Sequence, residues 1–514
     1  MEQYNPKNPD RFKQVELPPE PPIELNIVPL SKGQSTIKEG DFASKNFKPG
    51  RSGYRFREDG TMEALNIVAS NIQTYEATVS ANGGDYTTIT KALNDGKKRI
   101  FIRAGTYTED ITITTGDVLL KGENKESAII NGRIIIGPAS NDVYDIGTVS
   151  TTAGSTIITG SGTAWLTNVA TGQSISLPVI NPQNMLKYKI KSVDSNTQLT
   201  LEQPFPATMA VGTNYVVYKH LANFTVSDLT IKDTRGGGHI LSFKYSRDII
   251  VSNCIIYNRS TSATNNLTPL AITSGCVNVQ INNVTCGGKT DLTNFAFAVY
   301  HGGSQTQSYS ERVNENVSIT NCTGMSRAGF VIDWVRGCHI SNCYFEQASN
   351  VSMVQQTTGA RGITTGVSIS NCTFHFGALG VDIPDFGVEV VGCTFNSISI
   401  TNLTSMGAQN ITLSHCTFIG NTIYGVSEVV INGRDVVFVG NIVNGNVTNG
   451  VRLTSNASRS IVNGNSIREN GGTGILVDAG ATSNIITSNA SLGNSTAQYT
   501  DNGTTTTAAN NVVA

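Results

Sequence analysis

Charged side chains are scarce in this chain. Asp, Glu, Lys and Arg make up 14% of its 514 residues, against roughly 25% in an average soluble protein. The formal net charge is −2 and the isoelectric point is about 6.3, so no overall electric field draws the chain to nucleic acid or to an anionic membrane surface. We therefore expect neither a nucleic-acid partner nor a membrane partner.

Long apolar runs are also missing. No run approaches the roughly 20 residues that a membrane helix needs, and residues 1–22 lack the apolar segment of a secretory signal peptide. The deficit of charged residues is filled by Thr, Ser, Asn and Gly, with 51 Gly in the chain. This composition favours an all-β chain.

Paired cysteines at short spacing are absent as well. The chain has nine Cys, but no C-x₂-C pair of the kind that ligates zinc, and a disulfide framework is typical of small secreted domains instead. We expect no metal, no cofactor and no disulfide. The cysteines are interpreted as free thiols that pack as small apolar side chains.

A nine-residue phrase recurs along the second half of the chain. "GVSISNCTF" begins at Gly366 and returns as "GVEVVGCTF" at Gly387. Eleven copies align on the residue that is Cys in the two quoted phrases; these positions are Leu229, Cys254, Val284, Cys322, Cys343, Cys372, Cys393, Cys416, Asn441, Asn465 and Asn489. Spacings of 20 to 40 residues are typical of stacked supersecondary units.

Each copy predicts strand, tight bend, strand. In the first quoted phrase Val367 and Ile369 alternate with polar residues as in a strand, and the alternation slips at Asn371. Asn, Asp and Gly dominate this slip position, and they adopt left-handed backbone angles most readily. We therefore predict a right-handed, single-stranded parallel β-helix of at least eleven rungs, with six cysteines in one inward column: 254, 322, 343, 372, 393 and 416.

The chain divides into five segments by pattern. They are a Pro-rich extended attachment segment at 1–75, a cap with the first rungs at 76–143, an inserted small β-domain at 144–218, the main β-helix at 219–490 and an end segment at 491–514. The insertion is either decoration or a glycan-binding module, and in the second case Trp165 is expected to be exposed. Trp334 is the second aromatic candidate for glycan binding.

Two stretches resemble known families. "DYTTITKAL" and "IFIRAGTYTEDITI", within Gly83–Gly132, resemble the opening of pectate-lyase-like and pectinesterase-like β-helix proteins. Residues Gly53, Tyr54, Arg55, Phe56, Asp59, Gly60 and Glu63 match a hairpin pattern similar to that of bacteriophage tail fibres and tail-tip proteins. Together with the β-helix and the missing signal peptide, this match resembles a phage tailspike. The resemblance implies a homotrimeric virion tail protein, made in the host cytoplasm without a signal peptide, that contacts other tail proteins through 1–75 and binds a host-surface glycan.

Cleavage of that glycan would need a pair of carboxyl groups. They would be about 5 to 5.5 Å apart for retaining hydrolysis or about 6.5 to 9.5 Å for inverting hydrolysis. Asp382 and Asp385 flank Pro384 at a corner and are the first candidates; Asp333 and Glu346 come next. Asp333 and Asp382 are expected on one sheet, two rungs apart. The alternative for all four residues is a structural role as solvent-exposed carboxylates in turns.

Three functions stay open at this point. The first is a receptor-binding tail spike or fibre that binds surface polysaccharide. The second is the same architecture with depolymerase activity, as a glycoside hydrolase or a polysaccharide lyase. The third is a non-viral surface adhesin or structural solenoid.

Overall fold

The computed structural model describes 42–43, 54–56, 62–64 and 75–513, apart from 139–142, 178–186, 234, 236–237, 259–266, 288–294, 301–312, 327, 348–351, 356–364, 376–378, 383–387 and 397–410. The chain forms two compact units, Met1–Thr74 and Tyr75–Ala514. In the first unit, β2 (Tyr54–Phe56) pairs antiparallel with β1 (Phe42–Ala43) and with β3 (Met62–Ala64). No helix among the described residues is long and apolar enough to cross a membrane.

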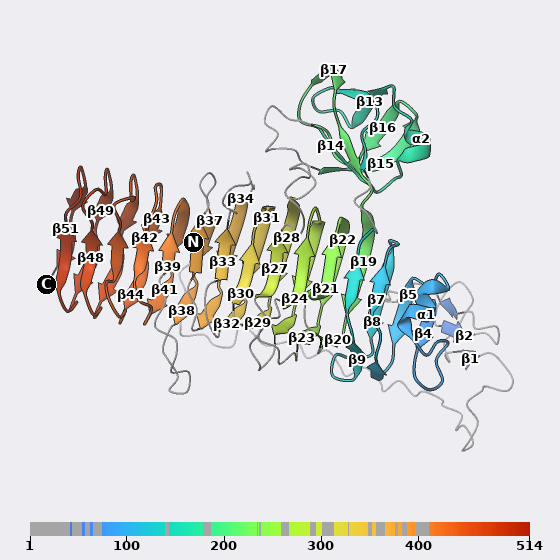
Figure 1. The fold of residues 1–514 in the computed structure, drawn as a ribbon, viewed down its shortest axis with the longest axis horizontal. Helices are drawn as coiled ribbons and strands as arrows, with labels where there is room; N and C mark the ends of the chain where they lie inside the picture. Colours follow the sequence, from blue (N-terminus) through green and yellow to red (C-terminus); the bar gives the residue numbers. More distant parts are fainter. Residues whose placement is uncertain are drawn as a thin grey trace, which may run out of the picture. The chain divides into compact units, whose positions relative to one another are not determined.

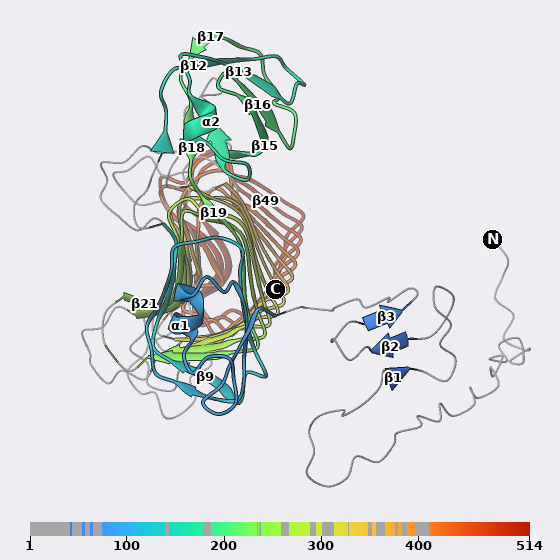
Figure 2. The same ribbon diagram turned by 90° about the vertical axis from the view of Figure 1, so that its right-hand side faces the viewer.

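Three long parallel sheets form the second unit (Figure 1). Each rung runs from the first sheet to the second and then to the third, and Figure 2 shows successive rungs lying over one another. The first sheet has 15 strands. In chain order they are β4 (Ala77–Val79), β5 (Arg99–Ile102), β8 (Val118–Gly122), β19 (Leu221–Ser227), β22 (Ser246–Ser252), β25 (Val277–Asn282), β28 (Asn314–Thr320), β31 (Val335–Ser341), β34 (Thr365–Ser370), β37 (Val388–Val391), β40 (Cys416–Ile419), β43 (Val437–Val439), β46 (Ile461–Asn463), β49 (Ile485–Thr487) and β52 (Thr507–Ala509).

The second sheet has 14 strands and the third has 13. The second contains β6 (Gly105–Tyr107), β9 (Ala128–Asn131), β20 (Thr230–Asp233), β23 (Ile255–Asn258), β26 (Thr285–Gly287), β29 (Thr323–Ser326), β32 (Tyr344–Gln347), β35 (Thr373–His375), β38 (Thr394–Asn396), β41 (Thr422–Tyr424), β44 (Ile442–Asn444), β47 (Ser466–Arg468), β50 (Ala490–Leu492) and β53 (Val512–Val513). The third contains β7 (Ile111–Ile113), β10 (Ile134–Ile136), β21 (Gly238–Lys244), β24 (Leu267–Thr273), β27 (Phe295–Tyr300), β30 (Ala328–Ile332), β33 (Ser352–Gln355), β36 (Leu379–Asp382), β39 (Ile411–Leu413), β42 (Val429–Ile431), β45 (Val451–Leu453), β48 (Thr473–Val477) and β51 (Ala497–Asp501).

The predicted bend is confirmed at every aligned position. All eleven slip residues have φ between 48° and 65°, in the left-handed region. Asn371 has φ 51° and Gly392 has φ 62°. The left-handed residue turns the chain through a corner while the apolar side chains on both sides of it stay inside, so one hydrophobic core fills the solenoid.

The core contains a stack of Phe rings. The ring centroids of Phe374 and Phe395 lie 4.7 Å apart with an interplanar angle of 4°, and those of Phe418 and Phe438 lie 5.7 Å apart with an interplanar angle of 12°. Phe374 and Phe395 are aligned on neighbouring strands of the second sheet, and Phe418 and Phe438 on neighbouring strands of the first, so parallel pairing in register stacks each pair of rings.

The thiol prediction is confirmed in its main part and wrong at one residue. All nine Cys are buried and free. Cys416, however, lies in the first sheet opposite Val388, whereas the residue that follows Cys393 in the inward column is Asn421. The copy that starts at Asn410 begins in the third sheet, and the corner that leads from it to the first sheet also needs a left-handed residue, His415. Two different corners therefore share one sequence signature.

Within the end segment predicted at 491–514, the described residues continue the solenoid past the predicted boundary at 490. β51, β52 and β53 continue the three ladders to Val513. At the other end, a short helix, α1 (Ile89–Asn94), contributes buried Ile89 and Ala92 to the core.

An eight-stranded antiparallel sheet is inserted between β10 and β19. It contains β11 (Val143–Tyr144), β12 (Thr148–Thr151), β13 (Ile157–Ser161), β14 (Ser174–Ser176), β15 (Lys187–Ser195), β16 (Gln198–Leu201), β17 (Met209–Thr213) and β18 (Val216–Tyr218), with helix α2 (Trp165–Asn168). The module has its own hydrophobic core. It contacts the solenoid through buried Lys187, whose Nζ donates to the carbonyl of Val313 at 2.5 Å and lies 3.5 Å from Glu315.

Candidate functional site

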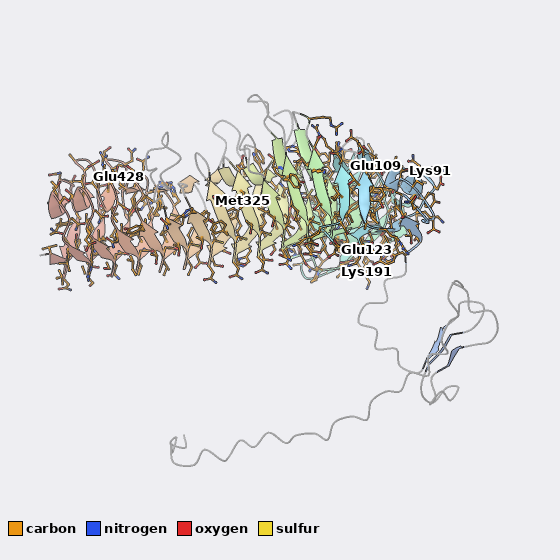
Figure 3. The ribbon with its side chains drawn as sticks, turned by 90° about the horizontal axis from the view of Figure 1, so that it is seen from below. Lys91, Glu109, Glu123, Lys191, Met325 and Glu428 are labelled. Atoms are coloured by element: carbon orange, nitrogen blue, oxygen red, sulfur yellow. The ribbon has the colours of Figure 1, made fainter. Side chains whose placement is uncertain are left out.

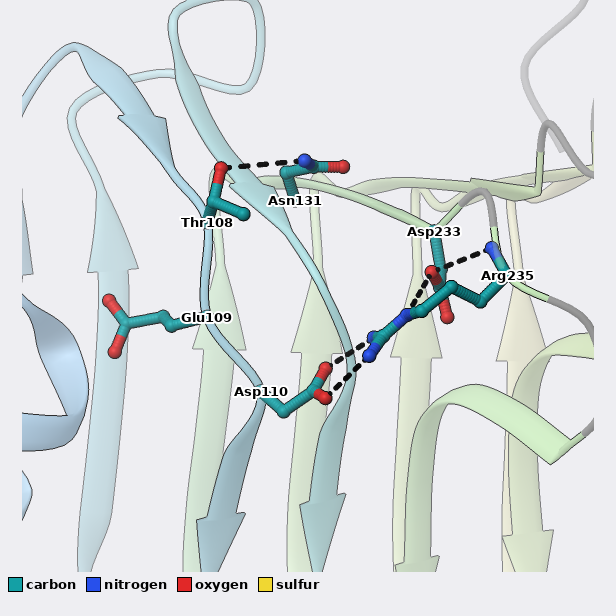
Figure 4. Close-up of a pocket in the computed structure, with 6 residues that line it drawn as sticks. All are labelled: Thr108, Glu109, Asp110, Asn131, Asp233 and Arg235. Carbon is teal, nitrogen blue, oxygen red and sulfur yellow. Dashed lines mark hydrogen bonds and ion pairs between the residues drawn. The ribbon is translucent and has the colours of Figure 1, made fainter.

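A pocket lies beside the second sheet in the first rungs of the solenoid. Its volume is about 430 Å³, and it is lined by Thr108, Glu109, Asp110, Asn131, Asp233 and Arg235 (Figure 4). Thr108 to Asp110 form the corner between β6 and β7, while Asn131 and Asp233 end β9 and β20. Because the rungs stack in register, these corners meet although Arg235 follows Asp110 by 125 residues.

Arg235 joins two carboxylates in this pocket. Its guanidinium donates to both oxygens of Asp110, at 2.7 and 2.5 Å, and its Nε donates to Asp233 at 2.9 Å. Arg133 donates a further hydrogen bond to the second oxygen of Asp233, which is only 2% exposed. The array is therefore held in one geometry from several sides.

The same contacts set the protonation of both acids. The hydrogen bonds from Arg235 hold the pKa of Asp110 at about 2. Burial raises the pKa of Asp233, but the hydrogen bonds from Arg235 and Arg133 outweigh this effect, and the net shift is downward. Both side chains are consequently anions across the physiological pH range and cannot supply a proton as a general acid.

The remaining lining residues have two roles: Glu109 stabilises a helix, and Asn131 and Thr108 face the pocket. Glu109 points away from Arg235 (Figure 4), and its carboxylate accepts from the backbone N–H groups of Ile89 and Thr90 at 2.9 and 2.8 Å. It thus caps the first turn of α1. Asn131 donates to the hydroxyl of Thr108 at 3.4 Å, a long contact that leaves amide and hydroxyl groups facing the pocket. Carboxylate, amide and hydroxyl groups in one fixed array suit a ligand rich in hydroxyl groups.

The first pair of predicted catalytic residues is only partly described. Asp382 ends β36 in the third sheet, and Asp385 lies outside the described residues. Asp382 is aligned with Gln355 of β33, and Ile332 of β30 is aligned with Val354. Asp333, which follows Ile332, is therefore two rungs from Asp382 as predicted, roughly 10 Å at the usual strand spacing.

Asp333 and Glu346 are not brought onto one surface. Asp333 is buried at the corner between the third and first sheets, and its carboxylate accepts from the backbone N–H of Trp334 at 3.0 Å. Glu346 lies half-buried in β32 of the second sheet. This separation removes the pair as acid and base of one reaction.

Both tryptophans proposed for glycan contact are buried, which corrects the prediction. Trp165 is 0% exposed, with its indole N–H donated to the hydroxyl of Tyr215 at 2.9 Å, and Trp334 is 2% exposed. Trp165 anchors the core of the inserted module. Neither ring presents a face on which a sugar could stack.

Sequence reasoning overlooked Asp110, Asp233 and Arg235. The signal was present in "TED" after one strand and "KDTR" after another, since charged residues at strand ends meet at one edge of a parallel sheet. Within the described part of the chain, no group of three His, Cys, Asp or Glu side chains could hold a metal ion.

Comparison with known proteins supports the class of fold. Residues 357–513 match the family described as right handed beta helix region. Together with the sheet pairing above, this match defines the chain as a right-handed parallel β-helix protein. No curated protein sequence matches the chain.

Several solved structures are similar at low identity. The tailspike protein gp49 of Pseudomonas phage LKA1 is 14% identical, over 77% of this chain and 75% of that chain, with a TM-score of 0.48. The gp54 tailspike of Acinetobacter baumannii bacteriophage AP22, solved with a capsular saccharide, is 13% identical, over 81% and 73%, with a TM-score of 0.45. PfbA, a surface adhesin of Streptococcus pneumoniae, is 12% identical, over 79% and 92%, with a TM-score of 0.39.

Proposed function

We propose that this chain is a bacteriophage tail spike or tail fibre protein that binds polysaccharide on the host surface. The observation that carries the binding function is the pocket of Asp110, Asp233 and Arg235. Its polar groups are preorganised by mutual hydrogen bonds, so a hydroxyl-rich ligand finds them already oriented.

The tail assignment is supported by the N-terminal unit. The residues that resemble tail-fibre hairpins include β2, and β2 pairs antiparallel with β3, with Arg55 opposite Glu63. Residues 1–75 would attach the protein to other tail proteins of the virion. By the same resemblance the protein would be a homotrimer made in the host cytoplasm, and light scattering at micromolar concentration tests this, with a monomer as the contrary result.

Binding is favoured over cleavage by the state of the acids. A glycoside hydrolase needs one carboxylic acid with a raised pKa to protonate the leaving group. In the pocket, arginine lowers the pKa of both Asp110 and Asp233. They therefore suit hydrogen bonding to sugar hydroxyl groups.

The experiment compares wild type with Arg235→Gln and Asp110→Asn on a panel of host-surface polysaccharides. We expect wild type to bind one of them, and each variant to bind it about tenfold more weakly or worse, as loss of a central interface contact does. Two assays on the same samples should show no turnover. A reducing-end assay detects hydrolysis, and absorbance at 235 nm detects the unsaturated products of a lyase.

Arg459→Gln is the matched control. Arg459 also donates two hydrogen bonds to one carboxylate, Asp435, and its side chain is 57% exposed, against 54% for Arg235. We expect this variant to bind as wild type does. Equal binding by all four proteins, or no binding by wild type, contradicts the proposed function.

A further inference from the structure

The outer face of the second sheet presents two columns of side chains in register. From β32 to β44, one column reads Glu346, His375, Asn396, Tyr424 and Asn444. The neighbouring column reads Tyr344, Thr373, Thr394, Thr422 and Ile442. The side chain between the two columns on each strand points into the core, as Phe374 and Phe395 show.

Aromatic rings lie on this face instead of in the core. Tyr344 is 36% exposed and Tyr424 is 40% exposed. The ring of Tyr344 stacks on that of His375, with centroids 6.5 Å apart and an angle of 27°. Met325 precedes Glu346 in the column and is 40% exposed (labelled in Figure 3).

The ring of Tyr424 lies beside a glycine of the next rung. A Cβ atom on Gly445 would lie 3.1 Å from the ring of Tyr424, tighter than nine in ten real Cβ contacts. Gly445 also has φ 63°. The missing side chain therefore leaves room for the Tyr424 ring beside the corner of the next rung.

The charge of the face limits what can bind there. From β32 to β44, Glu346 is the one Asp, Glu, Lys or Arg in the two outward columns, and its carboxylate would repel an anionic ligand. Nucleic acids and acidic polysaccharides need Lys or Arg to neutralise them. Three threonine hydroxyl groups and two amides lie in the two outward columns from β35 to β44, and they make the face too polar for an apolar protein partner. Aromatic faces with interspersed hydroxyl and amide groups suit neutral sugars.

We propose that the outer face of β32, β35, β38 and β41 is a second saccharide-binding surface, which takes a neutral polysaccharide chain lying parallel to the solenoid axis. Strands about 4.8 Å apart place Tyr424 of β41 about 14 Å along the axis from Tyr344 of β32, a span of several sugar rings. This inference rests on the proposed function, and it names the class of ligand.

Register links this surface to the pocket. Asn131, which lines the pocket, begins the column that continues through Lys232, Tyr257, Gly287 and Met325 to Glu346. A chain that fills the pocket and follows this column therefore reaches the tyrosines. Long chains should gain affinity over short oligosaccharides by engaging both places.

The test uses the full chain and affinity electrophoresis in gels that contain dextran, mannan or galactomannan as neutral probes and hyaluronate or alginate as anionic probes. We expect wild type to be retarded by a neutral probe. The variant with both Tyr344→Ala and Tyr424→Ala should bind that probe about tenfold more weakly, the usual effect of removing aromatic contacts. Tyr344→Phe with Tyr424→Phe should keep most of the affinity, because the ring faces remain.

Ile485→Ala is the matched control, because Ile485 faces outward from the first sheet and is 42% exposed. It should bind as wild type does, and thermal melting should show that all variants are folded. If the double alanine variant keeps wild-type affinity while Arg235→Gln loses it, the second surface is wrong and the proposed function stands. Stronger retardation by the anionic probes also overturns the inference. If wild type binds a host-surface polysaccharide but is retarded by none of these neutral probes, the inference is wrong and the proposed function stands.

Discussion

A ladder of buried asparagines offers the most quantitative test of the fold. After Cys393 the inward column continues as Asn421, Asn441, Asn465 and Asn489, each about 1% exposed. The Oδ1 of Asn465 accepts from the backbone N–H of Asn441 at 2.8 Å and from its side-chain amide at 3.1 Å. Each asparagine thus satisfies buried donors of the rung before it.

Asn465→Ala should destabilise the solenoid through those donors. It leaves the backbone N–H of Asn441 and one of its amide protons buried without an acceptor. The Oδ1 of Asn489 keeps the bond from the backbone N–H of residue 465, at 3.0 Å, and therefore adds little to the cost. At about 1–3 kcal/mol for each unsatisfied buried group, the loss is about 2–6 kcal/mol.

Urea denaturation of the second unit measures this loss, and hydrogen exchange at the amide of Asn441 locates it. Asn465→Cys should recover part of the stability, because the thiol of Cys343 in the same column accepts from the backbone N–H of Cys322 at 3.4 Å. Asn463→Ala, on the half-exposed face of β46 two residues before the corner that holds Asn465, is the control, with an expected loss within about 0.5 kcal/mol. Equal losses for Asn465→Ala and Asn463→Ala would refute the reasoning.

Three further outcomes are expected. Burial, with Lys187 and Arg247 close by, lowers the pKa of His220 well below its usual value, so the unfolded chain binds a proton that the folded chain refuses. Stability should therefore be full above about pH 6.5 and fall below it, and His220→Asn should reduce this slope in thermal melts. A thiol reagent should label the native protein slowly, because all nine cysteines are buried; rapid labelling contradicts the column. Asp382→Asn and Asp385→Asn should leave glycan binding unchanged, whereas a wild-type turnover that either one reduces roughly 10²-fold would make the pair acid and base of a depolymerase.

Local backbone preference makes the rung predictable from the amino-acid sequence. The residue at each slip has to adopt a left-handed φ, which Asn, Asp and Gly tolerate, and Asn371 does so. Alternating apolar residues on both sides of that bend can be buried only on the inside of a coil. Fold class and inward cysteines follow from these two requirements alone.

Which residues meet across rungs was decided only by the tertiary structure. The copy at Cys416 looks like its neighbours because two corners of the coil make the same backbone demand, and only strand pairing shows that Asn421 continues the column. The pocket is a stronger case. Asp110 and Arg235 meet across an inserted module, because the chain leaves the solenoid after β10 and resumes the same stack at β19. The lengths of the rungs and the insertions between them decide which residues meet in this way. A local sequence pattern does not show which rung lies beside it, so these contacts can be found only from the whole coil.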